Sequence, residues 1–215
     1  MKLFVWLLAV LGLFNGKDLS GWKLRDEKAD PTWKIVSSVK VDPANPKKLI
    51  GEGSEGILLR IPAEKATDLI SEKQFGDCEV HVEFFLAKDS NSGVFLMGKY
   101  EVQITDSFGI PDNKLQAGEC GGIPWLKAPL TNACKKPGEW QTMDIVFRAP
   151  MFNAAAKKMA NAKFVSITLN GKKVQENVEV PEPTGSELDG GEWASGPLMI
   201  QGNEGVVAFR NIVVK

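Results

Sequence analysis

Apolar and polar residues alternate without a break across residues 100–106, and this is the clearest pattern in the chain. Successive side chains of a β-strand point to opposite faces. The pattern therefore predicts a strand that carries Glu101, Gln103 and Thr105 on one face, with Glu101 and Gln103 about 7 Å apart. A carboxylate and a carboxamide in such a row can hold a hydroxylated ligand. The alternative is a strand whose polar face is simply solvated.

The longest alternating run covers residues 78–86, with His81 and Glu83 on its polar face. A short connection separates this run from residues 100–106, and strands close in sequence usually neighbour each other. We therefore expect both strands in one sheet, with their polar faces on the same side, so that His81 or Glu83 stands near Glu101. His81 is either a general base or a structural hydrogen-bonding group.

Short apolar runs separated by Gly- and Pro-containing turns make up most of the remaining chain. The Asn170-Gly171 pair predicts a hairpin with a type I′ turn. Residues 51–56 and 91–93 also predict turns, and residues 154–163 predict a short helix or a surface loop. About ten strands result, with no sustained helical period and no linker. The pattern predicts an all-β fold, a single-domain antiparallel β-sandwich of two sheets.

The N-terminus carries a different pattern, in which Lys2 precedes an apolar run from Leu3 to Leu13. This arrangement is typical of a secretory signal, and the run is too short to span a bilayer as a helix. We interpret residues 1–13 as a signal segment and residues 14–215 as the β-sandwich domain. This interpretation predicts export to the periplasm or the medium. The alternative is that the apolar run forms a buried first strand.

Composition narrows the class of partner. The chain has 26 basic and 27 acidic residues, and no basic block exceeds a Lys-Lys pair. Nucleic acid is therefore not expected as a partner. Six tryptophans stand against one tyrosine and one histidine. Trp stacks well on sugar rings, although it also fills cores. Trp125 follows a Gly-rich turn inside the long irregular stretch 114–137, which predicts a packed lid or the wall of a site.

The three cysteines divide into two groups. Cys78 occupies an apolar position of an alternating run, which favours core packing. Cys120 and Cys134 lie in the same irregular stretch and can close a loop as a disulfide in an exported protein, or can both stay reduced. The chain has no C-x-x-C motif and His81 is its one histidine, so ligation of a metal by Cys and His is not expected.

A series of short segments resembles the 3-keto-disaccharide hydrolase family, a bacterial family long known as a domain of unknown function. The resemblance runs from about Leu13 to the C-terminus, and it depends on the order of the segments more than on any one of them. They are LFNGKDLSGW at 13–22, FGD at 75–77, VHVEF at 80–84, NSGVF at 91–95, YEVQI at 100–104, GEW at 138–140, LNGK at 169–172, GPL at 196–198 and FRNI at 209–212.

The resemblance implies a concanavalin A-like jelly roll and an activity on glycosides whose sugar carries a ketone at carbon 3. That carbonyl acidifies the hydrogen on carbon 2, so a general base can remove it and the enolate can expel the glycosidic oxygen before water adds back. We assign Glu101 as this base. Other groups would bind the substrate, which is a small carbohydrate. Gln103, Asp106, Glu139 and Gln201 would hold hydroxyls, Arg210 would stabilise developing negative charge, and Trp125 would stack on the ring, with His81 as a further contact. The alternative for three of them is structural: Arg210 pairs with a carboxylate, Glu139 only starts a strand, and Gln201 only satisfies backbone groups.

The chain departs from the family pattern in two places. Many members carry a histidine before the glycine between the last two strands, where this chain has Asn203-Glu204-Gly205. Glu204 is therefore the candidate for proton transfer, and its carboxylate also suits a hard divalent metal. Members often show an Ile-Tyr pair after the Gly-rich turn, where this chain has Ile123-Pro124-Trp125.

Two other functions compete with a hydrolase or lyase of 3-keto-glycosides. The first is a non-catalytic carbohydrate-binding module that uses the same sandwich and the same polar face. The second is a retaining glycosidase, which requires two carboxyl groups about 5–5.5 Å apart. Glu101 and Asp106 are five residues apart and face opposite ways on a regular strand, so this pair would need a bulge.

Overall fold

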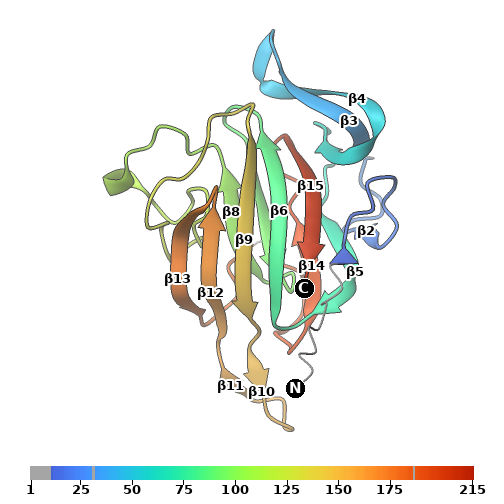
Figure 1. Cartoon of the computed structure of the whole chain (residues 1–215). Coiled ribbons are helices and arrows are strands. Elements are labelled where there is room, and N and C mark those ends of the chain that lie inside the picture. The colour runs from blue at the N-terminus through green and yellow to red at the C-terminus, as the bar shows by residue number, and fades with distance from the viewer. Residues whose placement is uncertain (1–10, 31, 186) are drawn as a thin grey trace, which may run out of the picture.

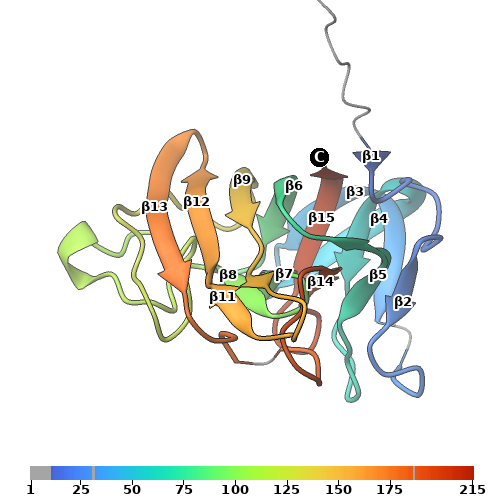
Figure 2. The same ribbon diagram turned by 90° about the horizontal axis from the view of Figure 1, so that it is seen from below.

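Two antiparallel sheets stack face to face in the computed structural model, which describes residues 11–30, 32–185 and 187–215 (Figures 1 and 2). The sandwich is a concanavalin-type jelly roll, which confirms the expected fold class. The eight-stranded sheet has the order β13 (Lys172–Val180), β12 (Ala162–Leu169), β9 (Trp140–Arg148), β6 (Cys78–Leu86), β15 (Val207–Val214), β4 (Asn45–Arg60) and β3 (Trp33–Asp42), with β1 (Leu11–Gly12) also paired to β15.

The second sheet has five strands, and it is the sheet that carries the polar row. Its order is β2 (Trp22–Leu24), β5 (Leu69–Phe75), β14 (Gly196–Ile200), β7 (Asn91–Leu96) and β8 (Tyr100–Thr105). Two short strands, β10 (Met151–Phe152) and β11 (Lys158–Ala160), form a separate pair, and a single 3-10 turn, η1, covers Asp112–Lys114.

The main core lies between the two sheets. Phe84 and Phe209 point inward from the larger sheet, and Val102 and Ile104 point inward from the smaller one, all of them fully buried. Since side chains alternate along a strand, the residues next to Val102 and Ile104 must point away from this core. A smaller apolar cluster around Phe85 covers the outer face of the larger sheet.

The irregular stretch between β8 and β9 closes one side of the sandwich, where it projects past β13 in both views (Figures 1 and 2). It bonds to the edge strand of each sheet. The Leu130 N–H donates to the Val174 carbonyl on β13, and the Gly121 N–H donates to the Gln103 carbonyl on β8, each at 2.8 Å. An exposed sheet edge is prone to pairing with other chains, so this stretch protects both edges.

The hairpin expected at Asn170-Gly171 is confirmed. β12 and β13 pair across these two residues, whose φ angles are 50° and 79°. Two positive φ values in a two-residue connection define the type I′ turn, which Asn and Gly adopt at the lowest steric cost.

The expectation that the strand at residues 78–86 shares a sheet with the strand at residues 100–106 is wrong. β6 belongs to the larger sheet, whereas β8 pairs with β7, which pairs with β14 in the smaller sheet. The chain crosses from one layer to the other between β6 and β7. Both strands have a fully apolar face, and placing them in opposite layers lets each face bury the other.

Two local predictions also fail, and a third is correct only in part. Residues 51–56 form no turn, because they continue β4 along β3, with Gly53 and Gly56 at φ 84° and 90° where the register shifts as in a β-bulge. Residues 91–93 open β7 and do not form a turn. The stretch 154–163 contains no helix, but residues 154–157 form an exposed turn, as the surface-loop alternative predicted, before β11 and the start of β12. Long-range pairing outweighs the local turn preference at residues 51–56 and 91–93.

The N-terminal prediction falls partly outside the described residues, which begin at Leu11. Leu11 and Gly12 pair with Val214 and Val213, and the Leu13 N–H donates to the Ile212 carbonyl at 2.8 Å. The end of the expected segment 1–13 therefore takes part in the larger sheet. None of the described residues forms a helix of the length and apolarity needed to cross a membrane.

Candidate active site

The outer face of the smaller sheet carries a row of polar side chains on three adjacent strands. Gln103 on β8 pairs with Gly93 on β7, and the Gln201 N–H, just after β14, donates to the Gly93 carbonyl at 2.9 Å. Glu101 lies two residues before Gln103 on β8, so its side chain is on the same face of the sheet. This row confirms the alternation seen in the sequence, and it places Glu101, Gln103 and Gln201 on one surface.

Two loops that cover the edge of β8 form walls beside this row. The Thr184 hydroxyl accepts the Glu101 N–H at 2.8 Å, and the Gly122 carbonyl accepts the Gln103 N–H at 3.0 Å. The backbone groups of an edge strand need partners when they are buried. These hydrogen bonds pair the backbone N–H groups of β8, and they also fix the loops at 116–125 and 182–185 beside the polar row.

The row and the walls enclose a cavity of about 420 Å³, within the size range of ligand pockets. Five of the residues expected in the site line it, namely Glu101, Gln103, Trp125, Gln201 and Glu204. The cavity is also lined by Asn91, Gln116, Ala117, Gly118, Pro124 and Thr184. The polar row, the Gly-rich loop and the loop before β15 thus meet at one place.

Glu101 is the most perturbed acid in this cavity. Its side chain lies on the cavity floor and is only 5% exposed. Burial, together with the negative charges of Asp68 and Glu204, raises its pKa from 4.5 to about 8. A carboxyl group with this pKa gains and loses its proton near neutral pH, which is the property required of a general acid–base group.

The absence of a side chain at Gly93 makes room for the Glu101 carboxyl group. A Cβ atom at position 93 would lie 2.2 Å from Oε1 of Glu101 and 2.9 Å from its Cδ. Real Cβ atoms do not approach other atoms this closely, so the carboxyl group occupies space that any larger residue would fill. No signal along the chain points to this role, because residues 91–93 are typical of a turn.

The loop that carries Gln201 and Glu204 is held at Gly202 by two buried charged residues. The Gly202 N–H donates to Oδ1 of Asp68 at 2.8 Å, and the Gly202 carbonyl accepts from Nε of Arg60 at 2.6 Å. Burial lowers the pKa of Arg60, and the nearby Glu204 carboxylate opposes this shift. Sequence reasoning missed Arg60 and Asp68, although each is a charge next to an otherwise apolar run.

The two glutamines of the row differ in their partners. Nε2 of Gln103 donates to Oδ1 of Asn91 at 2.6 Å, which fixes its orientation. Oε1 of Gln201 is buried and has no hydrogen-bond partner within the described protein. A buried polar group without a partner is uncommon in folded proteins. Gln201 lines the cavity, so a ligand there can supply the missing bond.

Trp125 stands at the rim of the cavity with 92% of its surface exposed. Its φ angle of 64° is in the left-handed region, which is rare for a large residue. An exposed indole held in a strained backbone conformation beside a polar cavity is arranged to stack on a ligand and contributes little to the core.

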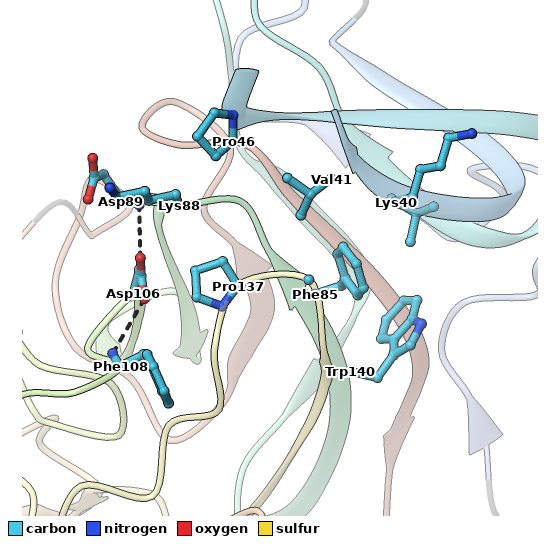
Figure 3. Close-up of a pocket in the computed structure, with 12 residues that line it drawn as sticks. Lys40, Val41, Pro46, Phe85, Lys88, Asp89, Asp106, Phe108, Pro137 and Trp140 are labelled. Atoms are coloured by element: carbon cyan, nitrogen blue, oxygen red, sulfur yellow. Dashed lines mark hydrogen bonds between the residues drawn. The ribbon is translucent and has the colours of Figure 1, made fainter. Parts of the chain in front are cut away.

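Asp106 lies apart from this cavity. Its carboxylate accepts the Asp89 N–H at 3.0 Å and lines a larger hollow of about 750 Å³ over the outer face of the other sheet, floored by Phe85 and Trp140 (Figure 3). The second carboxylate there, Asp89, pairs with Lys47 at 2.9 Å. Despite its size, this hollow offers no carboxyl group in a buried setting like that of Glu101. Asp106 and Glu101 therefore line different cavities.

Three other expected site residues lie on or near the outer face of the larger sheet. Nδ1 of His81 is 2.7 Å from Oδ1 of Asp144, and Nε of Arg210 donates to Glu83 at 2.7 Å while its guanidinium stacks on Trp140. Glu139 is exposed and lies 3.9 Å from Lys136. The expectation that these residues share a hollow with Glu101 is wrong, because β6, β9 and β15 lie in the opposite layer.

The described residues hold no cluster of three His, Cys, Asp or Glu side chains that could bind a metal ion. Glu204 is exposed at the cavity rim, and Glu101 is the other acid that lines the cavity. The carboxylate donors expected for a divalent metal are therefore incomplete in this cavity.

The family model of the 3-keto-alpha-glucoside-1,2-lyase-like domain matches residues 11–215. The chain belongs to this family. The match extends from the first described strand to the C-terminus and includes every residue that lines the cavity.

Solved structures similar to this family member come from Parabacteroides distasonis. One candidate glycosyl hydrolase is 27% identical with a TM-score of 0.70, and the alignment covers 96% of this chain and 83% of that one. A second is 18% identical with a TM-score of 0.64, covering 96% and 93%. No curated protein matches the chain. The family and the first of these structures assign the protein to a carbohydrate-acting class.

Proposed function

We propose that this family member cleaves the glycosidic bond of 3-keto-glycosides by elimination followed by hydration, with Glu101 as the general base. The observation that supports this most is the position of the Glu101 carboxyl group. It is buried on the floor of the cavity, it has a pKa near neutrality, and it lies beside carboxamides that suit sugar hydroxyls. An ordinary glycoside carries no acidic C–H bond and gives such a base nothing to remove.

The reaction begins when the Glu101 carboxylate removes the proton on carbon 2. The electrons of that C–H bond form an enolate with the carbonyl at carbon 3. The enolate then re-forms the carbonyl and makes a double bond between carbons 1 and 2, while the bond from carbon 1 to the leaving oxygen breaks. The leaving oxygen takes a proton. Water adds at carbon 1 and a proton returns to carbon 2, which completes a net hydrolysis.

The remaining residues of the cavity have separate roles. Oε1 of Gln201, which has no partner within the described protein, accepts a hydrogen bond from a sugar hydroxyl, and the buried positive charge of Arg60 lies behind its loop. Gln103, held by Asn91, binds a sugar hydroxyl. Glu204 is exposed at the rim, where it exchanges a proton with the leaving oxygen or with water.

Turnover of matched substrates tests the proposal. A 3-keto-disaccharide and its unoxidised parent are incubated with the protein, and released monosaccharide is quantified. We expect release from the keto form alone. Binding of either sugar without release would favour the carbohydrate-binding module. Release from the unoxidised parent would favour a retaining glycosidase, although Glu101 and Asp106 line different cavities and do not supply its carboxyl pair.

The pH dependence of kcat/KM provides a separate prediction. Glu101 accepts a proton only as a carboxylate, and burial raises its pKa to about 8. We therefore expect kcat/KM for the keto substrate to rise with pH and to level off above about 8, with a tenfold fall per pH unit well below that value. Initial rates across a buffer series measure this. A profile that is level from pH 6 to 9 would contradict the assignment.

Trp125→Ala tests the role of the rim. We expect KM to rise about 3- to 10-fold, because a stacking contact with the sugar ring is lost. The melting temperature should stay unchanged, since Trp125 is 92% exposed and packs against little of the protein. Trp193→Ala is the matched control, because Trp193 is 64% exposed and lines a different cavity. Equal KM values for the two variants would remove Trp125 from the binding site.

A further inference from the structure

Two cysteine thiols meet where the cavity wall joins the end of β8. Cys120 is buried at 2% exposure, Cys134 is half-buried, and each thiol shifts the pKa of the other. Both cysteines contact residues 105–107, at the end of β8. The Cys120 N–H donates to Oγ of Ser107 at 2.8 Å, and Sγ of Cys134 lies 3.7 Å from the Thr105 carbonyl. Both cysteines are reduced in this structure.

The two thiols have different chemical characters. The hydrogen bond from Cys120 lowers the pKa of Cys134, and the same bond, together with burial, raises the pKa of Cys120. Cys134 is also the more accessible of the two. A thiol with a lowered pKa attacks disulfides more readily, and a buried neighbour in contact with it is positioned to resolve the product.

We propose that Cys120 and Cys134 are a redox-active pair that a small-molecule disulfide such as oxidised glutathione converts to an intramolecular disulfide. The Cys134 thiolate attacks one sulfur of oxidised glutathione, which forms a mixed disulfide and releases one glutathione thiolate. Cys120 loses its proton and attacks Sγ of Cys134, which releases the second glutathione. The protein dithiol is oxidised by two electrons, and one oxidised glutathione is reduced to two glutathione molecules.

The disulfide would close the loop that forms one wall of the cavity. Pro124 and Trp125 lie between the two cysteines and line the cavity. A disulfide that joins residues 120 and 134 removes conformational freedom mainly from the unfolded chain. The oxidised protein should therefore be the more stable form. Cys78 takes no part, because it lies on β6 and burial raises the pKa of its thiol to about 12.

The test uses the folded, full-length protein, first reduced and then treated with oxidised glutathione without denaturant. We expect an intact mass lower by two hydrogen atoms and a cross-linked peptide pair that contains Cys120 and Cys134. The melting temperature should rise by about 5–10 °C. Cys78→Ser should behave in the same way. Cys120→Ser should stop at the mixed disulfide, with one glutathionyl group on Cys134.

Several results would overturn the proposal. They are an unchanged mass for the folded wild type, a cross-link that includes Cys78, or glutathione trapped on Cys134 of the wild type without closure. A melting temperature that does not rise on oxidation would refute the stabilising role. Because the mass and peptide measurements use the wild-type protein, they decide the question even if Cys120→Ser does not fold.

Discussion

Glu101→Gln is expected to lower kcat/KM for a 3-keto-disaccharide by about 10²–10⁴-fold. Glutamine has nearly the same shape as glutamate but cannot accept the proton on carbon 2. The cavity should keep its form, because the bond from the Glu101 N–H to Thr184 comes from the backbone. Steady-state rates measure the loss, and calorimetric titration of the variant with the keto substrate should give a Kd close to the KM of the wild type.

Glu179→Gln is the matched control, since Glu179 is an exposed strand glutamate on β13, outside the cavity. Its kinetics should equal those of the wild type. If Glu101→Gln kept full turnover of the keto substrate, Glu101 could not be the base. Loss of binding together with turnover would instead indicate that Glu101 holds the sugar.

The same variant has a second expected effect, on stability. The pKa of Glu101 is about 8 in the folded protein and 4.5 as its ordinary value, so the folded state binds this proton more tightly than the unfolded state. Glu101 therefore lowers the free energy of unfolding progressively as the pH rises from 4.5 to about 8, and it has no such effect below 4.5. Glu101→Gln removes this pH-dependent decrease in the free energy of unfolding.

Denaturant unfolding of wild type and variant across this pH range measures the difference. It should grow with pH to an order of magnitude of a few kcal/mol in favour of the variant. A difference that is constant with pH would show that Glu101 has similar proton affinities in the folded and unfolded states. The kinetic prediction does not depend on this result, so the two can be judged separately.

Gly93→Ala is expected to cause a comparable loss of activity through a single methyl group. The new Cβ would lie 2.2 Å from Oε1 of Glu101, so the carboxyl group must leave its position on the cavity floor. A misplaced catalytic group can lower the rate by about 10²-fold. We expect kcat to fall by at least this factor, together with a modest fall in melting temperature from overpacking. Steady-state kinetics and thermal melts measure both.

Gly191→Ala is the control for this substitution, because a Cβ at Gly191 meets no atom within 4 Å. It lies in a loop outside the cavity, and its kinetics should match those of the wild type. Normal activity of folded Gly93→Ala would show that the Glu101 carboxyl group tolerates displacement, and would argue against its role as a positioned base.

The fold class could be predicted because its signals are local. Alternation at residues 78–86 and 100–106 identifies two strands, and Asn170-Gly171 identifies a hairpin, since each depends on neighbours along the chain. The same alternation placed Glu101 and Gln103 on one face. Membership of the family could also be predicted, because several short segments recur in a constant order.

The partners of each strand could not be predicted, because pairing depends on which apolar faces bury one another across the whole chain. Two strands with the same alternating pattern, β6 and β8, entered opposite layers. This separated His81 and Arg210 from Glu101, whereas Gln201, a hundred residues away in sequence, became its neighbour.

The sequence by itself determined that this protein is a β-sandwich with an acid and an amide on one strand face, since strand geometry follows from alternation. Only the tertiary structure decided which residues surround that acid. Gly93 gives it room, and Arg60 and Asp68 hold the loop beside it. Burial and neighbouring charges raise its pKa, and these arise from groups brought together in space.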